Sequence, residues 1–181
     1  MAKNEGKRFE SAISNSFPEH VLVKRLNDNA AGWSGGANTR FSSTNEVDFI
    51  CFDSNKRVFY AFELKSTQGT SLSFWREDFE SKGKKQTFMI KKNQILGMQK
   101  WSKFPCVICG FIFNFRNGDN STYFVSIENF TEYTVGLEKK SVNLNDVMAM
   151  GAIEIESKLL RTNYSYDIEG LLERTSEKYA V

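Results

Sequence analysis

Two strongly apolar stretches of the sequence carry charged residues, and no other feature restricts the fold as much. The stretches are 46–52 and 58–66, with Asp48 in the first and Glu63 and Lys65 in the second. Short apolar runs on either side of a polar turn predict a β-hairpin. Charged side chains are almost never fully buried unless they pair with opposite charge or coordinate a metal ion. Any fold of this chain therefore has to gather these three charges around a ligand or around one another.

The predicted hairpin places its charged side chains together. Alternation along the second strand puts Glu63 and Lys65 on one face and Phe62 and Leu64 on the other. Carboxylate oxygens suit Mg²⁺, and one or two Mg²⁺ ions supply the charge neutralisation and the hydroxide that phosphodiester hydrolysis requires. Asp48 and Glu63 would hold the metal, while Lys65 would hold the attacking water or the phosphate. The pattern favours a metal-dependent nuclease; the alternative is a solvated Glu63–Lys65 pair, worth about 0–1 kcal/mol.

Two predicted helices offer further candidates for the same centre. Residues 4 to about 16 form the first, because Phe9 and Ile13 recur at helical spacing, and Glu10 lies on or beside that apolar face. Gln94 stands near the start of the helix expected over 91–102, where its amide oxygen would serve as a metal ligand. We therefore include Glu10 and Gln94 among the candidate site residues.

The order of elements predicts an α/β fold with a mixed central sheet flanked by helices, as a single domain over residues 1–181. Strands are expected at 21–26, 46–52, 58–66, 107–115 and 123–127, and helices at 4–16, 91–102, 142–150 and 168–174. A loop or short stalk is expected at about 27–44, a segment rich in Asn, Gly, Ser and Thr. Its large residues, Trp33 and Phe41, would either anchor it to the core or stack on unpaired bases.

Composition narrows the partners and the compartment. The net charge of +2 does not indicate a nucleic-acid partner, so a basic surface has to be local. Candidate DNA contacts are Lys24, Arg25, Lys82, Lys84, Lys85, Lys91 and Lys92, although a run of lysines is also typical of a solvated loop. The three cysteines are expected to be buried free thiols, as in a reducing cytoplasm. No stretch is apolar for the roughly 18 residues of a membrane span, and no signal peptide is expected.

The charged hairpin and its surroundings resemble a known family. The residues Val47-Asp48-Phe49 and Phe62-Glu63-Leu64-Lys65 resemble the core of the PD-(D/E)xK nucleases. More narrowly, the chain resembles the RecU-type Holliday junction resolvases of Gram-positive bacteria and their phages. The matching segments are 6–10, 23–25, 41–44, 61–67, 93–95 with Met98, and 107–115, in consistent order over roughly residues 5 to 127.

The resemblance implies a restriction-endonuclease-like fold and a homodimer that cuts two opposed strands of a four-way DNA junction symmetrically. It implies Mg²⁺ as cofactor, with Mn²⁺ able to substitute, and cytoplasmic action in a bacterial cell or a phage-infected host. The family's metal ligands fall on Asp48, Glu63 and Gln94, and its transition-state lysine falls on Lys65. Glu46 stands where the family usually has a threonine ligand, and we expect it to take part in metal binding.

Two other functions remain open at this stage. A related PD-(D/E)xK nuclease would cut or nick ordinary duplex DNA. A non-catalytic protein that binds DNA junctions would keep the fold without the activity.

Overall fold

The strand β3 (Val58–Thr67) lies near the middle of a six-stranded sheet and is buried along most of its length. It pairs antiparallel with β2 (Phe49–Asp53) and parallel with β5 (Val107–Phe115). Its sequence is strongly apolar on both faces, as expected of a strand covered by helices on both sides. The computed structural model describes residues 5–26, 45–79 and 87–179.

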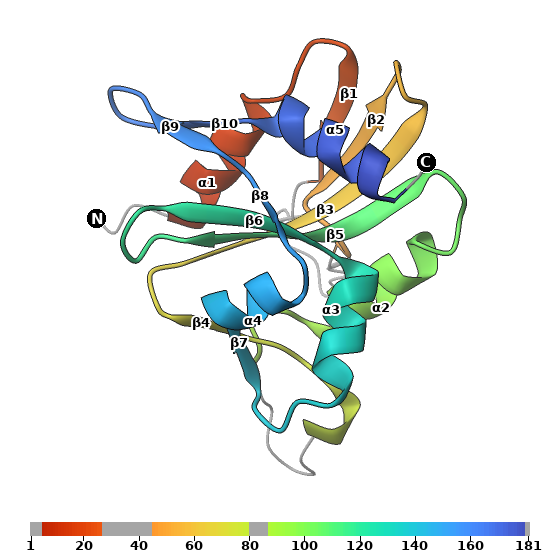
Figure 1. Ribbon diagram of the computed structural model, residues 1–181, viewed down its shortest axis with the longest axis vertical. Coiled ribbons are helices and arrows are strands. Elements are labelled where there is room, and N and C mark those ends of the chain that lie inside the picture. Colours follow the sequence, from red (N-terminus) through yellow and green to blue (C-terminus); the bar gives the residue numbers. More distant parts are fainter. Residues whose placement is uncertain (1–4, 27–44, 80–86, 180–181) are drawn as a thin grey trace, which may run out of the picture.

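The other elements surround this central trio of strands (Figure 1). The sheet has the order β1-β2-β3-β5-β6-β8, and two small two-stranded sheets, β4 with β7 and β9 with β10, lie outside it. The remaining elements are α1 (Glu5–Ser14), β1 (Val21–Arg25), β4 (Ser71–Ser73), the 3₁₀ helix η1 (Glu77–Phe79), α2 (Lys92–Trp101), β6 (Ser121–Ser126), α3 (Ile127–Val135), β7 (Ser141–Asn143), α4 (Leu144–Ala149), β8 (Ile153–Glu154), β9 (Ser157–Leu159), β10 (Tyr164–Tyr166) and α5 (Ile168–Lys178).

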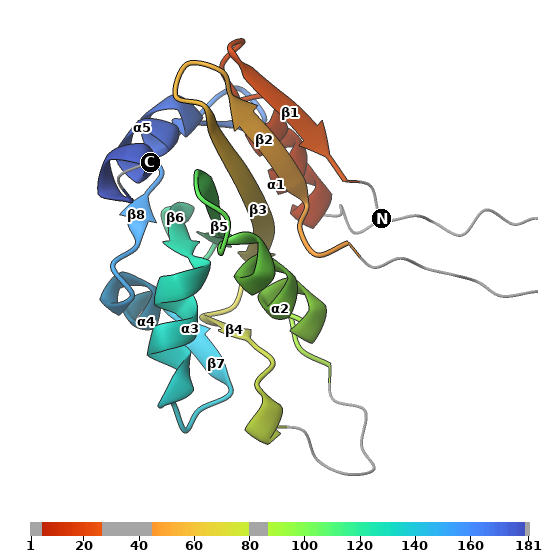
Figure 2. The ribbon, with the colours of Figure 1, turned by 90° about the vertical axis from the view of Figure 1, so that its right-hand side faces the viewer.

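Helices cover both faces of the sheet, and each face has its own apolar core. Helices α1 and α5 pack on the face that carries Tyr60 and Phe62. Helices α2, α3 and α4 pack on the face that carries Ala61 and Phe111 (Figures 1 and 2). The predicted mixed sheet flanked by helices is confirmed, and so is the alternation of side chains along β3.

Within the described ranges, no helix combines the length and the apolar character that crossing a bilayer requires.

Several predictions at the level of single elements were wrong. Cys106 is exposed rather than buried, because it occupies a turn before β5 with a left-handed backbone (φ 59°); Cys51 and Cys109 are buried as expected. Helix α3 was not predicted, since its apolar start continues the apolar run of β6. The boundary is set by Ser126, whose side chain accepts a hydrogen bond from the backbone of Asn129 and caps the helix.

The helix expected over 142–150 starts later, because residues 141–143 pair with β4. The hairpin of β9 and β10 was also not predicted. Its strands have three residues each, too few to show a periodic pattern. The predicted stalk at 27–44 lies outside the described residues, as do Trp33 and Phe41.

The close packing of β5 on β6 yields a test of the fold. At Gly110, an added Cβ would lie 2.3 Å from the carbonyl oxygen of Val125 and 2.5 Å from the ring of Phe124. Because the first of these atoms is backbone, Gly110→Ala has to displace a strand, and we expect it to lower the free energy of unfolding by about 1–3 kcal/mol. Denaturant unfolding measures the change. Gly136→Ala is the matched control, since no atom lies within 4 Å of its added Cβ; equal losses in the two variants would contradict the packing described.

Candidate functional site

Glu63 is the centre of the charged cluster. Its side chain faces α2 from the middle of the sheet and the residue is only 2% exposed. The ammonium of Lys65 donates a hydrogen bond to Glu63 Oε1. The amide nitrogen of Gln94, on the first turn of α2, donates to the same oxygen at 2.5 Å. Glu63 and Lys65 lie two positions apart on β3, whereas Gln94 lies on α2. The structure thus brings these three side chains together.

Asp48 lies beside Glu63, immediately before β2. Its backbone N–H donates to the carbonyl of Phe62 at 2.9 Å, and its Oδ2 accepts from the backbone N–H of Leu64 at 2.8 Å. These bonds continue the register that pairs Phe49 with Phe62, so Asp48 is opposite Glu63 on the neighbouring strand. The negative charge of Asp48 acts on Glu63 and contributes to raising its pKa. The predicted pair of carboxylates is therefore present in space.

The electrostatics of this centre leave Glu63 short of positive charge. Burial, and to a smaller extent the charge of Asp48, raise the pKa of Glu63, while Lys65 and Lys91 lower it; with all of these effects together the pKa is raised to about 8. At neutral pH the carboxyl therefore tends to keep its proton. A divalent cation between the two carboxyl groups would supply the missing charge, and hard oxygen donors are the ligands that Mg²⁺ prefers. The donor set thus fits a magnesium site.

The protein contribution to such a site is small. Over the described part of the chain, no group of three or more His, Cys, Asp or Glu side chains is arranged to hold a metal ion. A cation bound by Asp48 and Glu63 would complete its coordination with water, backbone or substrate oxygens, as Mg²⁺ commonly does.

Gln94 and Glu46 reach this region from α2 and from the segment before β2. The Oε1 atom of Gln94 accepts from the backbone N–H of Lys91 at 2.9 Å, so its nitrogen, not its oxygen, faces Glu63. Glu46 lies against Gly97, one turn along α2, where an added Cβ would be 2.4 Å from Glu46 Cδ. In this arrangement Gln94 orients Glu63; a metal-ligand role for Gln94 or Glu46 stays a prediction.

The two basic residues at the end of β1 lie on opposite faces of the sheet. Lys24 pairs with Ile50 and Arg25 pairs with Phe49, so alternation places Lys24 on the face of Glu63 and Arg25 on the other. Arg25 hydrogen-bonds Glu10 of α1, which packs on that second face. The structure thus ties Glu10 to Arg25, and a catalytic role for Glu10 stays a prediction.

The predicted lysine contacts divide into two groups. Lys91 and Lys92 are exposed at the start of α2, and the ammonium of Lys92 lies 4.5 Å from the centre of the Trp75 ring. Lys91 is close enough to Glu63 to lower its pKa. The other three, Lys82, Lys84 and Lys85, lie outside the described residues.

Sequence reasoning missed a polar network directly behind Lys65. Ser66 donates to Asn114 Oδ1 at 2.8 Å and accepts from Arg116 Nε at 3.0 Å. Alternation alone puts Ser66 on the face opposite Lys65. Its partners on β5 follow only from the parallel register, which pairs Ser66 with Asn114 and which no local pattern specifies.

Comparisons with known proteins give a relative in sequence and a similar solved structure. No protein-family model matches the chain. The chain is 31% identical, over 184 residues, to the SPbeta prophage-derived uncharacterized protein YotM of Bacillus subtilis (strain 168). The alignment covers 94% of this chain and 86% of that protein. The chain belongs to the same family as this prophage-derived protein.

Among solved structures, the Holliday junction resolvase Hjc of the archaeal hyperthermophile Archaeoglobus fulgidus is similar with a TM-score of 0.48 and 9% sequence identity. The similarity covers 82% of this chain and 93% of the archaeal one. At that level it assigns no role to any residue of this chain.

The raised pKa of Glu63 makes the stability of the metal-free protein depend on pH. Between its ordinary value of 4.5 and about 8, the folded protein holds a proton that the unfolded chain releases. The free energy of unfolding therefore falls as the pH rises through this window. We expect Glu63→Gln to remove this part of the pH dependence. Denaturation in EDTA across the pH range measures it.

The control for this pH experiment is Glu132→Gln, at an exposed position of α3. The difference in the free energy of unfolding between Glu132→Gln and the wild type should be constant across the pH range. If Glu63→Gln also differs from the wild type by a constant amount, the pKa assigned to Glu63 is contradicted.

Proposed function

We propose that the protein is a Mg²⁺-dependent DNA endonuclease of the PD-(D/E)xK type, with a restriction-endonuclease-like fold, that resolves four-way junctions. The single observation that carries the proposal is the buried carboxyl of Glu63, held by Lys65 and lying beside Asp48 in the interior of a hairpin. Such a cluster costs stability unless a ligand compensates it, and clusters of this kind are found where proteins bind or react with charged ligands.

The residues have complementary roles in this proposal. Asp48 and Glu63 would hold Mg²⁺ or Mn²⁺, which supplies Lewis-acid activation of water and phosphate when bound. The backbone of Leu64 fixes Asp48, and Gln94 fixes Glu63, so both carboxyl groups are oriented in advance. Lys65 lies next to them and would stabilise the negative charge that develops on the phosphate.

The finer substrate assignment rests on the resemblance of residues 5 to 127 to RecU-type resolvases. It is supported by the prophage origin stated in the name of the relative from Bacillus subtilis. Under this proposal the protein acts in the cytoplasm of a bacterial cell or a phage-infected host. Phosphate contacts would come from Lys24, Arg25, Lys82, Lys84, Lys85, Lys91 and Lys92. A resolvase makes two cuts in a two-fold symmetric substrate, so we propose a homodimer with isologous contacts.

The first test is cleavage of a labelled four-way junction with Mg²⁺, beside a linear duplex of the same sequence. We expect symmetric paired incisions in the junction and none when EDTA removes the metal. Asp48→Asn, Glu63→Gln and Lys65→Met should each lower the cleavage rate by about 10²–10³-fold or more, because each removes charge at the reacting phosphate. The same variants should still bind the junction in a gel-shift assay.

The controls separate the two alternative functions. Glu132 is exposed on α3, so the Glu132→Gln variant should cleave the junction at the wild-type rate. Linear duplex cut as fast as the junction would replace junction resolution by ordinary duplex cleavage. Tight junction binding without cleavage, and no Mg²⁺ binding by calorimetry, would leave only the non-catalytic function.

The homodimer is tested separately by light scattering. We expect a mass near twice 20.7 kDa at micromolar concentration. A mass that stays at that of one chain, both alone and with junction DNA, would contradict coordinated paired incision by this protein.

A further inference from the structure

The hairpin of β9 and β10 exposes an unusual tip. Leu159 is 63% exposed and Leu160 is 52% exposed, and they are flanked by the exposed cations Lys158 and Arg161. Residues 157–166 contain no acidic residue. The turn is closed by a hydrogen bond from the backbone N–H of Leu160 to the carbonyl of Asn163, at 2.8 Å. The tip therefore combines apolar side chains with positive charge.

This hairpin is fixed to the first helix of the chain. Arg8 donates to the carbonyl of Thr162 at 3.0 Å, and the backbone N–H of Tyr166 donates to Ser16 Oγ at 3.0 Å. The rings of Phe9 and Tyr166 pack edge to face, with centroids 5.5 Å apart. The exposed leucines are thus held out on a braced support, and their exposure does not come from a loosely attached segment.

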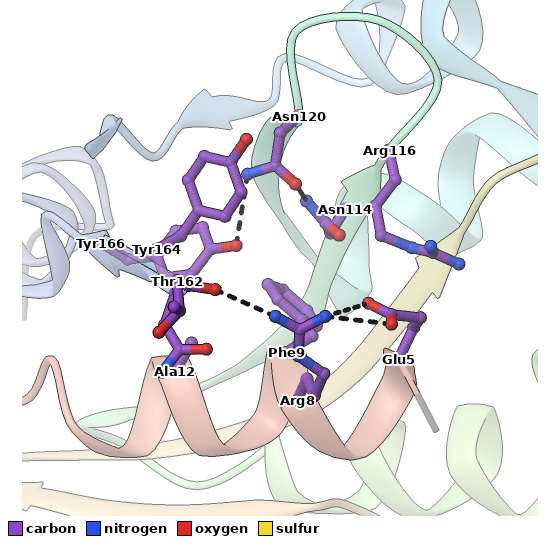
Figure 3. A pocket seen from close by; sticks show the side chains of 11 residues that line it. Glu5, Arg8, Phe9, Ala12, Asn114, Arg116, Asn120, Thr162, Tyr164 and Tyr166 are labelled. Atoms are coloured by element: carbon purple, nitrogen blue, oxygen red, sulfur yellow. Dashed lines mark hydrogen bonds and ion pairs between the residues drawn. The ribbon is translucent and has the colours of Figure 1, made fainter. Parts of the chain in front are cut away.

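A trough lined by both polar and apolar side chains runs between α1 and the hairpin and continues to the end of β5 (Figure 3). Arg8 borders it from α1 and Arg116 from the residue after β5, while Tyr164 and Tyr166 line the side of the hairpin. Among the described residues that line it, Glu5 is the one carboxylate, and Arg8 already bonds it at 3.1 Å.

One cation that borders the trough, Arg116, and two on the adjoining hairpin, Lys158 and Arg161, are available to a ligand. Over the described residues, no carboxylate lies within ion-pair distance of Arg116, Lys158 or Arg161. Backbone phosphates are bound by such arginines and lysines, together with the amide and hydroxyl groups that asparagine and tyrosine provide. The arginine, amide and hydroxyl groups that border the trough therefore suit a sugar-phosphate backbone.

Hydrogen bonds connect this trough to the candidate active site. Ser66, the residue after Lys65, bonds Asn114; Asn114 bonds Asn120; and the amide of Asn120 lies 3.4 Å from the hydroxyl of Tyr166. Lys65 and Ser66 point to opposite faces at the same end of β3. A DNA segment in the trough would thus pass the end of β3 near which the carboxylate cluster lies, on the opposite face of the sheet.

We propose that the hairpin of β9 and β10, with α1 and Arg116, forms a second DNA-binding surface, and this rests on the proposed function in DNA cleavage. Lys158, Arg161 and Arg116 contact backbone phosphates. Leu159 and Leu160 lie against bases that are unstacked at a branch point, as apolar side chains flanked by cations do in proteins that kink DNA. A protein partner is the less favoured occupant, because lysine is depleted from the cores of protein interfaces.

The test measures DNA binding by fluorescence anisotropy in EDTA, where no cleavage occurs, over a series of salt concentrations. The double variant Lys158→Gln with Arg161→Gln should bind junction and linear duplex about tenfold more weakly. Its slope of log affinity against log salt should be shallower by about 2, since each lost phosphate contact contributes about 0.9. Leu159→Ser with Leu160→Ser should keep the slope and lose part of the preference for the junction.

The matched control is Lys100→Gln with Lys103→Gln, two exposed cations at the end of α2 and away from the hairpin. It should bind with the wild-type affinity and slope. Wild-type protein that binds no DNA overturns both the proposed function and this inference. Wild-type protein that cleaves DNA, with an unchanged slope in the Lys158/Arg161 variant, overturns the inference alone. So does a leucine variant that changes the oligomeric state and leaves DNA binding intact.

Discussion

The site depends on the burial of one carboxyl group in the middle of a sheet. Glu63 lies on a strand that is paired on both sides and covered by helices on both faces, so water cannot solvate its charge. Lys65 and Gln94 compensate only in part, and the pKa of Glu63 stays high. Replacing a buried charged cluster as a whole with well-packed apolar residues is often neutral or stabilising in an ordinary core. A ligand that brings positive charge would account for the retention of Glu63, which is why the cluster carries the functional proposal.

The part of this site that the sequence could predict is the part that lies on adjacent strands. Alternation and the short turn of the hairpin fix Asp48, Glu63 and Lys65 on one face, and the structure brings them together. The contact of Gln94 with Glu63 needs in addition the placement of α2, which the sequence predicts only as a helix. The orientation of the amide, with its nitrogen toward Glu63, depends on a bond to the backbone of Lys91 that no pattern reveals.

The limits of prediction are clearest where two elements meet without a local signal. The mixed sheet followed from the order of strands and helices. The register of β3 on β5 did not, because it is a parallel pairing across about 40 intervening residues. The partners of Ser66 follow from this register. Likewise Lys24 and Arg25 are neighbours in sequence and seemed a single basic pair. The alternation of β1 separates them, so that Arg25 bonds Glu10 on the far face and only Lys24 shares the face of Glu63.

Alternation of side chains in this way gives the two faces of the sheet different chemistry near the end of β3. The α2 face carries acidic oxygens and the half-buried ammonium of Lys65, which suits a metal ion and a reacting phosphate. The α1 face carries amides, tyrosines and arginines without a compensating excess of acid, which suits a phosphate backbone that is held and not cleaved. Because Lys65 and Ser66 are consecutive residues, the two surfaces cannot move far apart. A substrate with more than one duplex arm would be able to occupy both surfaces at once. A single straight duplex would have to bend around the end of β3 to reach both, at a cost in deformation energy.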